Sequence, residues 1–169
     1  MERIAYEQWC TPLAAGHVLR YEYAAQHILP DEVINDIACG IGYGATYLAP
    51  LGEYHGYDKP GVPDDRFPGY FHEVDLDNIY FRPDAADVTV CFETLEHLQV
   101  PSLLARRLAK STRRMVVVSV PTQPTVGQNE WHLHDFTVDD IPPMFPGFEV
   151  VDLWAQPDEL SHVWRMERT

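Results

Sequence analysis

The sequence contains few features of membrane, secreted or zinc-binding proteins. No stretch of its 169 residues approaches the length of about 18 consecutive apolar residues that spans a bilayer. Residues 1–4 have neither the basic nor the apolar segment of a signal peptide. The three cysteines, Cys10, Cys39 and Cys91, have no spacing typical of metal ligands, and we expect the last two to be small core residues. These absences predict a cytoplasmic protein with no membrane partner.

Basic residues are also scarce. Only 12 lysines and arginines accompany 26 aspartates and glutamates, for a formal net charge of −14. Proteins that bind long nucleic acids normally carry basic surfaces, so this balance argues against such partners. Five of the basic residues cluster between positions 106 and 114, and we expect them to form a solvated helix face.

The chain does contain enough apolar material for one folded domain. Hydrophobic residues make up 46% of the sequence and aromatic residues 12%. A chain of this length can bury roughly 70% of its unfolded surface. Because no internal repeat or linker divides it, we predict a single domain over residues 1–169.

Apolar periodicity and turn residues predict the order of the elements. Helices are expected over residues 13–29, from 43 to a stop at 50–52, over 101–110 and, briefly, over 137–145. Strands are expected over residues 33–37, in a segment that ends at 58, and over 70–74, 88–92, 115–120, 148–154 and 160–166.

This order favours an α/β fold with a doubly wound, mostly parallel sheet of seven strands. The last two strands should form an antiparallel hairpin at its edge. The connections 59–69 and 77–86 are interrupted by prolines, so we expect loops and reduced helices after the second and third strands. One face of the sheet would then be thinly covered, and a second copy of the chain in a homodimer could shield it.

The most informative segment is residues 33–44, where an apolar run breaks into Gly40, Gly42 and Gly44. A strand that enters such a turn and then a helix lets a flat cofactor approach bare backbone. The spacing is G-x-G-x-G, whereas the dinucleotide fingerprint is G-x-G-x-x-G. Asp58 follows at the end of the next predicted strand, where an acidic side chain can accept hydrogen bonds from both hydroxyls of a ribose.

The segment resembles motif I of the class I S-adenosylmethionine-dependent methyltransferases. The resemblance extends over roughly residues 13–148 and implies a Rossmann-like fold with S-adenosyl-L-methionine as cofactor. It implies cofactor contacts from Arg20, Tyr21, Asp36, Ala38, Gly40, Gly42, Asp58, Asp75, Leu76, Phe92 and Glu93.

The resemblance assigns distinct roles to the acidic residues. Asp36 would lie near the cofactor's ammonium group, Asp58 at the ribose and Asp75 at the adenine amino group, with Leu76 giving backbone contacts. The alternatives are that Asp36 only caps the turn, that Asp58 is a solvated strand end and that Asp75 is a surface residue.

Two further segments resemble the family. In residues 86–98, similar to motif IV of small-molecule methyltransferases, Phe92 and Glu93 would line the pocket near the transferred methyl group. In the N-terminal helix, Arg20 or Tyr21 would help to close the site over the cofactor's carboxylate. Otherwise Tyr21 belongs to the core and Arg20 to the solvent.

The candidate catalytic residues are three histidines, His97, His132 and His134. His97 could act as general base because its unperturbed pKa lies near neutrality, or it could merely order its loop. The other two lie in a loop that resembles the acceptor side of a glycan- and metabolite-modifying subset. There Trp131 and Phe136 could stack on a sugar or aromatic ring. We predict no metal site, because this loop is irregular and has no cysteine nearby.

Together these features predict S-adenosylmethionine-dependent methyl transfer to a small-molecule acceptor by in-line displacement. The acceptor atom is expected to be an oxygen, for example a sugar or metabolite hydroxyl. The main alternative is a non-catalytic cofactor-binding or partner-binding module of the same fold. A nicotinamide-dependent oxidoreductase is disfavoured, because neither G-x-G-x-x-G nor Tyr-x-x-x-Lys is present.

Overall fold

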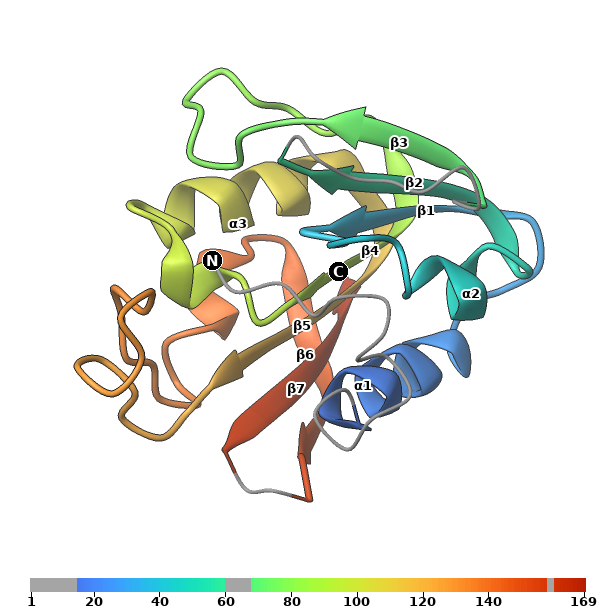
Figure 1. The fold of residues 1–169 in the computed structure, drawn as a ribbon. Helices are drawn as coiled ribbons and strands as arrows, with labels where there is room; N and C mark the ends of the chain where they lie inside the picture. Colours follow the sequence, from blue (N-terminus) through green and yellow to red (C-terminus); the bar gives the residue numbers. More distant parts are fainter. Residues whose placement is uncertain (1–14, 60–67, 158–159) are drawn as a thin grey trace.

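The computed structural model describes residues 15–59, 68–157 and 160–169. They contain one seven-stranded sheet with the strand order β3-β2-β1-β4-β5-β7-β6 (Figure 1). The strands are β1 (Glu32–Ile37), β2 (Gly52–Asp58), β3 (Tyr70–Glu73), β4 (Ala86–Phe92), β5 (Thr112–Pro121), β6 (Phe148–Ala155) and β7 (Ser161–Arg168). The predicted α/β sheet with a C-terminal antiparallel hairpin is therefore confirmed.

Strand β1 lies at the point where the order in which the chain adds strands to the sheet reverses. It pairs in parallel with β2 on one side, Asp36 opposite Gly56, and with β4 on the other, Asp36 opposite Val90. The chain runs outward from β1 to β3 and then returns to the other side of β1 as β4. In sheets of this kind, ligands bind outside the carboxyl ends of the strands at this switch point.

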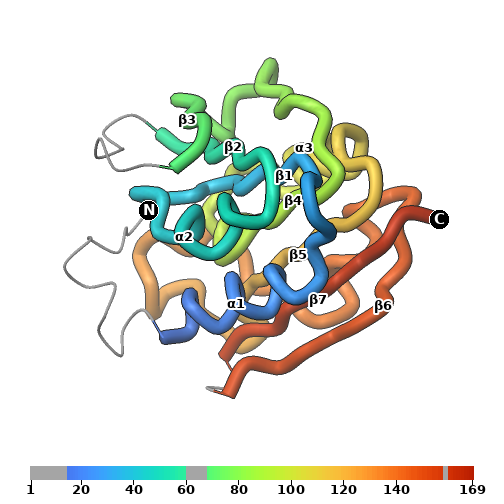
Figure 2. The backbone as a smooth tube through the Cα atoms, turned by 90° about the vertical axis from the view of Figure 1, so that its right-hand side faces the viewer, coloured from blue at the N-terminus to red at the C-terminus, as the bar shows by residue number. Residues whose placement is uncertain are grey.

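Helices cover both faces of the sheet, as a doubly wound fold requires (Figures 1 and 2). On one face, α3 (Pro101–Ser111) packs Leu104 and Leu108 into a cluster that also contains Trp164 of β7. On the other face, α1 (Ala15–Ala25) and the short α2 (Ala45–Leu48) pack against Tyr54 and their strand neighbours. Burial of these apolar side chains supplies the main stabilisation of the fold.

The first helix reaches across to the C-terminal hairpin. The Tyr23 hydroxyl donates a hydrogen bond of 2.6 Å to Asp152, and its ring stacks on Trp154, both on β6. This contact accounts for the position of α1 beside the hairpin in Figure 2. No helix among the described residues is long and apolar enough to cross a membrane.

The element boundaries differ from the predictions in several places. The first helix ends at Ala25, earlier than predicted, and its predicted start at 13–14 lies outside the described residues. The predicted helix over 137–145 contains only the single-turn 3-10 helix η4 (Pro142–Met144). Residues 77–85 form turns and loops as predicted, whereas 60–67 lie outside the described part of the chain.

The basic cluster is not a uniformly solvated face. Arg107 is buried, and its guanidinium donates to the backbone carbonyls of Asn78 and Ile79. Arg114 forms an ion pair of 2.5 Å with Glu32. The prediction was wrong for these two residues, because the loop after β3 and the start of β1 bring acceptors that local sequence does not reveal.

Candidate functional site at the carboxyl ends of the strands

A cavity of about 260 Å³ lies at the carboxyl ends of the parallel strands. Its walls come from the segments that follow β2, β3, β4 and β5, which meet on one side of the sheet in Figure 1. The lining residues are Asp58, Lys59, Leu76, Asp77, His97, Leu98, Gln99, Glu130, Trp131 and Leu133. Of the predicted site residues, the cavity thus brings together Asp58, Leu76 and His97.

The glycine turn has positive φ angles at an alanine as well as at two glycines. Ala38, the first residue after β1, has a φ of 64°, and Gly40 and Gly42 have φ values of 59° and 86°. Residues with side chains seldom adopt such angles. Strain of this kind is concentrated at functional sites, so Ala38 supports the prediction that this turn binds a ligand.

Asp58 connects the glycine turn to the cavity. Its carboxylate accepts a hydrogen bond of 2.7 Å from the N–H of Gly40 and one of 2.6 Å from the N–H of Lys59. The side chain is buried, so the alternative of a solvated strand end is wrong.

Asp36 lies beneath the glycine turn, on the face that α1 covers. It accepts hydrogen bonds from the hydroxyls of Tyr54, at 2.6 Å, and Tyr21, at 3.0 Å. Complete burial raises the pKa of Asp36 to about 7 in spite of these donors. A Cβ atom on Gly44 would come within 2.2 Å of the Tyr21 ring, so only glycine fits this close approach. Tyr21 thus belongs to the core and positions the Asp36 carboxylate.

The buried side chain of Arg20 also lies next to the half-buried side chain of Glu93. The guanidinium of Arg20 donates to the side chain of Gln156 and lies 3.5 Å from a carboxylate oxygen of Glu93. That carboxylate accepts hydrogen bonds from the hydroxyls of Ser119, at 2.8 Å, and Ser161, at 3.0 Å. Arg20 is therefore buried, and the alternative that its side chain lies in solvent is wrong.

Phe92 also lies on the face of the sheet that α1 covers. Its buried ring packs edge-on against Tyr21 with centroids 5.0 Å apart. It belongs to the cluster under α1 and α2 and is not among the residues that line the cavity. The predicted cofactor contacts thus do not all meet in one place, since Asp58 and Leu76 line the cavity whereas Tyr21, Asp36 and Phe92 lie beneath the glycine turn.

The third strand brings a different acid to the cavity from the one predicted. Asp75 is exposed, lies 3.7 Å from the ammonium group of Lys59, and is not among the lining residues. Asp77 lines the cavity instead, and its carboxylate accepts a hydrogen bond of 2.9 Å from the N–H of Gln99.

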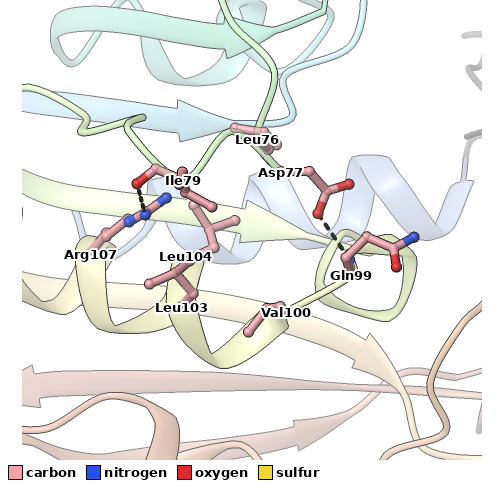
Figure 3. Close-up of a pocket in the computed structure, with 8 residues that line it drawn as sticks. All are labelled: Leu76, Asp77, Ile79, Gln99, Val100, Leu103, Leu104 and Arg107. Carbon is pink, nitrogen blue, oxygen red and sulfur yellow. Dashed lines mark hydrogen bonds between the residues drawn. The ribbon is translucent and has the colours of Figure 1, made fainter.

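A smaller cavity of about 30 Å³ shares residues Leu76, Asp77 and Gln99 with the first (Figure 3). Its lining shows which contacts hold the loop after β3 in place. Leu103 and Leu104 of α3 pack against the loop after β3, and Arg107 donates to the carbonyl of Ile79. On the opposite side of the view, Asp77 turns toward Gln99. Helix α3 therefore anchors the segment that carries Leu76 and Asp77.

Two of the three predicted histidines, His97 and His132, are in contact, and His97 lines the cavity. His97 ends the 3-10 helix η3 (Leu95–His97), and its Nδ1 lies 2.9 Å from the carbonyl of Trp131. The ring of His132 approaches it edge-on, with centroids 4.7 Å apart. Burial lowers the pKa of both imidazoles, so both are neutral near pH 7.

The loop after β5 reaches this position through backbone bonds. The N–H groups of Leu133 and His134 donate to the carbonyl of Glu96, at 2.8 and 3.3 Å. His134 points elsewhere, with its Nε2 2.9 Å from the carbonyl of Leu98 and its ring stacked on Phe136. Phe136 itself is buried in the core, so the prediction that it stacks on an acceptor was wrong.

Sequence reasoning did not identify Glu96 as a separate feature of the site. The side chain is only 1% exposed, and within the described residues neither carboxylate oxygen has a hydrogen-bond partner. Burial and the neighbouring Glu93 raise its pKa well above the ordinary range. The Glu-His pair in the sequence was a signal, but its burial depends on the loop that covers η3.

No protein-family model and no curated protein sequence matches this chain. Solved structures do resemble it. Magnesium protoporphyrin IX methyltransferase from Synechocystis PCC 6803, solved with S-adenosylhomocysteine, superposes with a TM-score of 0.76 at 16% identity, over 100% of this chain and 90% of that one. The same enzyme has also been solved with S-adenosylmethionine, at a TM-score of 0.70.

Two other neighbours extend the range of functions that this fold supports. A chain of the complex with the Haloferax volcanii Trm112 methyltransferase activator matches at a TM-score of 0.67 and 14% identity, over 99% of both chains. The cyclase SpnF matches at 0.69 and 12% identity, over 92% of this chain and 81% of that one. The chain therefore has the fold of the class I S-adenosylmethionine-dependent methyltransferases.

Proposed function

We propose that this protein transfers a methyl group from S-adenosylmethionine to a small-molecule acceptor. The observation that carries the proposal is the cavity at the switch point of the sheet, with the buried Asp58 carboxylate at its edge. Open α/β sheets bind ligands at this position. The neighbours solved with S-adenosylmethionine or S-adenosylhomocysteine have the same fold.

The residues around the cavity fit the adenosine part of that cofactor. Asp58 can accept from the ribose hydroxyls, Asp77 can accept from an exocyclic amino group, and Leu76 gives an apolar surface for a base. Gly40 and Gly42 allow close approach at the turn because they have no Cβ. When bound, the cofactor supplies an electrophilic methyl group on a sulfonium.

The acceptor is proposed to be a hydroxyl-bearing small molecule that enters beside Trp131. This indole is 49% exposed and lines the cavity, so it offers a flat surface for a sugar or an aromatic ring. His97 is the predicted catalytic histidine that lines the cavity. Its Nδ1 donates to the Trp131 carbonyl, which leaves the lone pair on Nε2 free to act on an acceptor.

A second candidate function is cofactor binding without turnover. It is favoured by the pairing of Arg20 with Glu93 and of Glu93 with Ser119 and Ser161. These groups, predicted to contact the cofactor, already have partners within the fold. An enzyme that requires an activator would also bind the cofactor without turnover when assayed alone, and one structural neighbour is a methyltransferase solved in complex with such an activator.

Titration calorimetry tests the proposal, with S-adenosylmethionine and S-adenosylhomocysteine as ligands and NAD as the control. We expect both sulfur ligands to bind at micromolar concentration and NAD not to bind. Absence of binding by both sulfur ligands would overturn the proposal. Binding without turnover across a panel of hydroxyl-bearing acceptors would instead support the second candidate.

A further inference from the structure

Three side chains beside the cavity form a cluster, of which the proposed function uses only His97. One potential ligand atom from each of Glu96, His97 and His132 lies within 4.8 Å of the other two. They come from η3 and from the loop after β5, which the carbonyl of Glu96 holds in place. The cluster is therefore a product of the tertiary fold.

Glu96 is the unusual member. Both carboxylate oxygens are buried and have no hydrogen-bond donor among the described residues, and His97 Nε2 lies 3.8 Å from one of them. A buried carboxylate without donors is unfavourable by several kcal/mol, so folded proteins normally give it a partner. A cation held between these groups would provide that partner.

His97 has the orientation of a metal ligand. Its Nδ1 lies 2.9 Å from the Trp131 carbonyl, and because a carbonyl only accepts, this nitrogen carries the hydrogen. The lone pair is then on Nε2, which faces Glu96. Metal-binding histidines usually donate their second N–H to a carbonyl or carboxylate in this way, which fixes the tautomer and the ring orientation.

His132 can supply the third ligand with a small adjustment. Its Nδ1 lies 2.6 Å from the Thr125 hydroxyl and its Nε2 3.1 Å from the Asn129 amide. The Asn129 oxygen accepts from the N–H of Trp131, so its amide nitrogen is the group that faces His132. One of these two neutral contacts would give way to the ion.

We propose that Glu96, His97 and His132 bind one divalent first-row transition-metal ion, with further coordination positions open toward the cavity. Two imidazoles and one carboxylate form a donor set that suits Zn²⁺, Fe²⁺, Co²⁺ or Mn²⁺ better than Mg²⁺. This replaces the expectation of no metal site. That expectation depended on the absence of cysteine, whereas the ligand here is a glutamate from another segment.

The metal would define the acceptor further, and this part of the inference rests on the proposed function. Open positions on such an ion bind hydroxyl, phenol or carboxylate oxygens, and the ion lowers the pKa of a hydroxyl that it binds. His97 lines the cavity, so a bound oxygen would lie at its wall. His97 and His132 would then act as ligands in place of general bases.

Metal binding can be measured directly on the full chain after treatment with a chelator. Calorimetry with Zn²⁺ and the visible absorption of a Co²⁺ complex are the two readouts. The unaltered protein should bind one equivalent of either ion. Glu96→Gln and His132→Asn should each weaken binding at least about tenfold, because each removes one ligand.

A matched control distinguishes this site from adventitious binding to neighbouring histidines. His55 and His72 also lie with ring nitrogens 2.9 Å apart, on β2 and β3. His72→Asn should leave the stoichiometry and affinity unchanged. An equal loss in His72→Asn, or unchanged binding in both Glu96→Gln and His132→Asn, would overturn the assignment, as would a protein that binds neither ion.

S-adenosylhomocysteine binding, measured on the same samples, keeps the two proposals apart. Zn²⁺ binding without S-adenosylhomocysteine binding would support the metal site and overturn the proposed function. The reverse result would overturn only the metal site. If Glu96→Gln fails to fold, His132→Asn alone decides, because its side chain is partly exposed and its loss leaves no buried charge.

Discussion

Two turns follow the strands at the switch point of the sheet, and a buried carboxylate lies next to each of them with a different set of partners. After β1, Ala38 has a positive φ and Asp36 receives two tyrosine hydroxyls. After β4, Glu93 has a positive φ, and Glu96 receives no donor from the described residues. The first carboxylate has its partners within the fold. The second has a place for a cation, and the difference shows that burial alone does not assign a role.

The largest expected effect is on the pH dependence of the free energy of unfolding, and it comes from Asp36. The pKa of Asp36 is about 7 when folded, against an ordinary value of 3.8, so the folded state holds an extra proton between these values. This contribution to stability is lost as the pH rises through that window. Between pH 5 and pH 8 the loss should be about 3 kcal/mol.

Asp36→Asn should remove this component. Urea unfolding at several pH values would then show the variant gaining stability relative to the unaltered protein from pH 5 to pH 8. Asp87→Asn is the control, because Arg113 lowers the pKa of Asp87 and the residue does not titrate in that range. Parallel curves for Asp36→Asn and the unaltered protein would show that Asp36 is ionised throughout.

The next effect concerns the packing that positions Asp36. In Gly44→Ala the new methyl group would lie 2.2 Å from the Tyr21 ring and 2.8 Å from the Asp36 carboxylate. Such overpacking should reduce the free energy of unfolding by about 2–3 kcal/mol. Gly127→Ala is a useful contrast, because no atom lies within 4 Å of its added methyl group and only the positive φ opposes it. We expect about 1 kcal/mol there.

Removing one tyrosine hydroxyl would leave Asp36 with fewer hydrogen-bond donors and so make it more like Glu96. Tyr54→Phe deletes the donor at 2.6 Å and leaves Asp36 with Tyr21. The free energy of unfolding at pH 8 should fall by about 2 kcal/mol, since the lost bond is to a charged acceptor. At pH 5, where Asp36 is protonated, the loss should be smaller. Equal losses at both pH values would contradict this explanation.

The carboxylate of Asp58 shares features with both of these carboxylates. Asp58 is buried and bonded to Gly40, yet it also lines the cavity. Asp58→Asn keeps an acceptor for the Gly40 N–H but removes the charge. Affinity for S-adenosylhomocysteine should fall by about tenfold, which corresponds to roughly 1.4 kcal/mol. Unchanged affinity in calorimetry, with the thermal midpoint also unchanged, would remove Asp58 from the ribose site.

The smallest effect has the opposite sign. Without metal, Glu96→Gln removes a carboxylate that has no donor, so the variant should be more stable by about 1 kcal/mol at pH 8. Urea unfolding in the presence of a chelator measures this directly. Addition of Zn²⁺ should then stabilise the unaltered protein more than the variant. A destabilised, chelator-treated variant would mean that Glu96 has a structural partner.

Much of the sheet was predictable from local pattern. The runs at 88–92 and 115–120 are apolar except for Thr89 and Ser119, and they lie in the buried central strands β4 and β5. The predicted hairpin over 148–166 corresponds to β6 and β7. Errors arose where neighbouring segments decide the outcome, as in the helix that ends at Ala25 and the segment 137–145, which lacks the predicted helix.

The candidate site was only partly predictable for the same reason. The chain order places Asp58 and His97 after parallel strands, so their approach to one cavity follows from topology. Which of Asp75 and Asp77 faces that cavity depends on the turn that α3 anchors. The partners of Arg20 come from Gln156 and Glu93, far away in the sequence, and no local pattern indicates them.

By itself, the sequence determined the order of the strands along the chain, the glycine turn and the acidic strand ends, because periodicity and backbone freedom are local properties of the chain. Only the tertiary structure decided which buried charges are paired. Asp36 meets Tyr21 and Tyr54, and the Glu96-His97 pair meets His132, through contacts between separate segments of the chain. The energy of a buried charge depends on those contacts, so its role cannot be read from its own position in the chain.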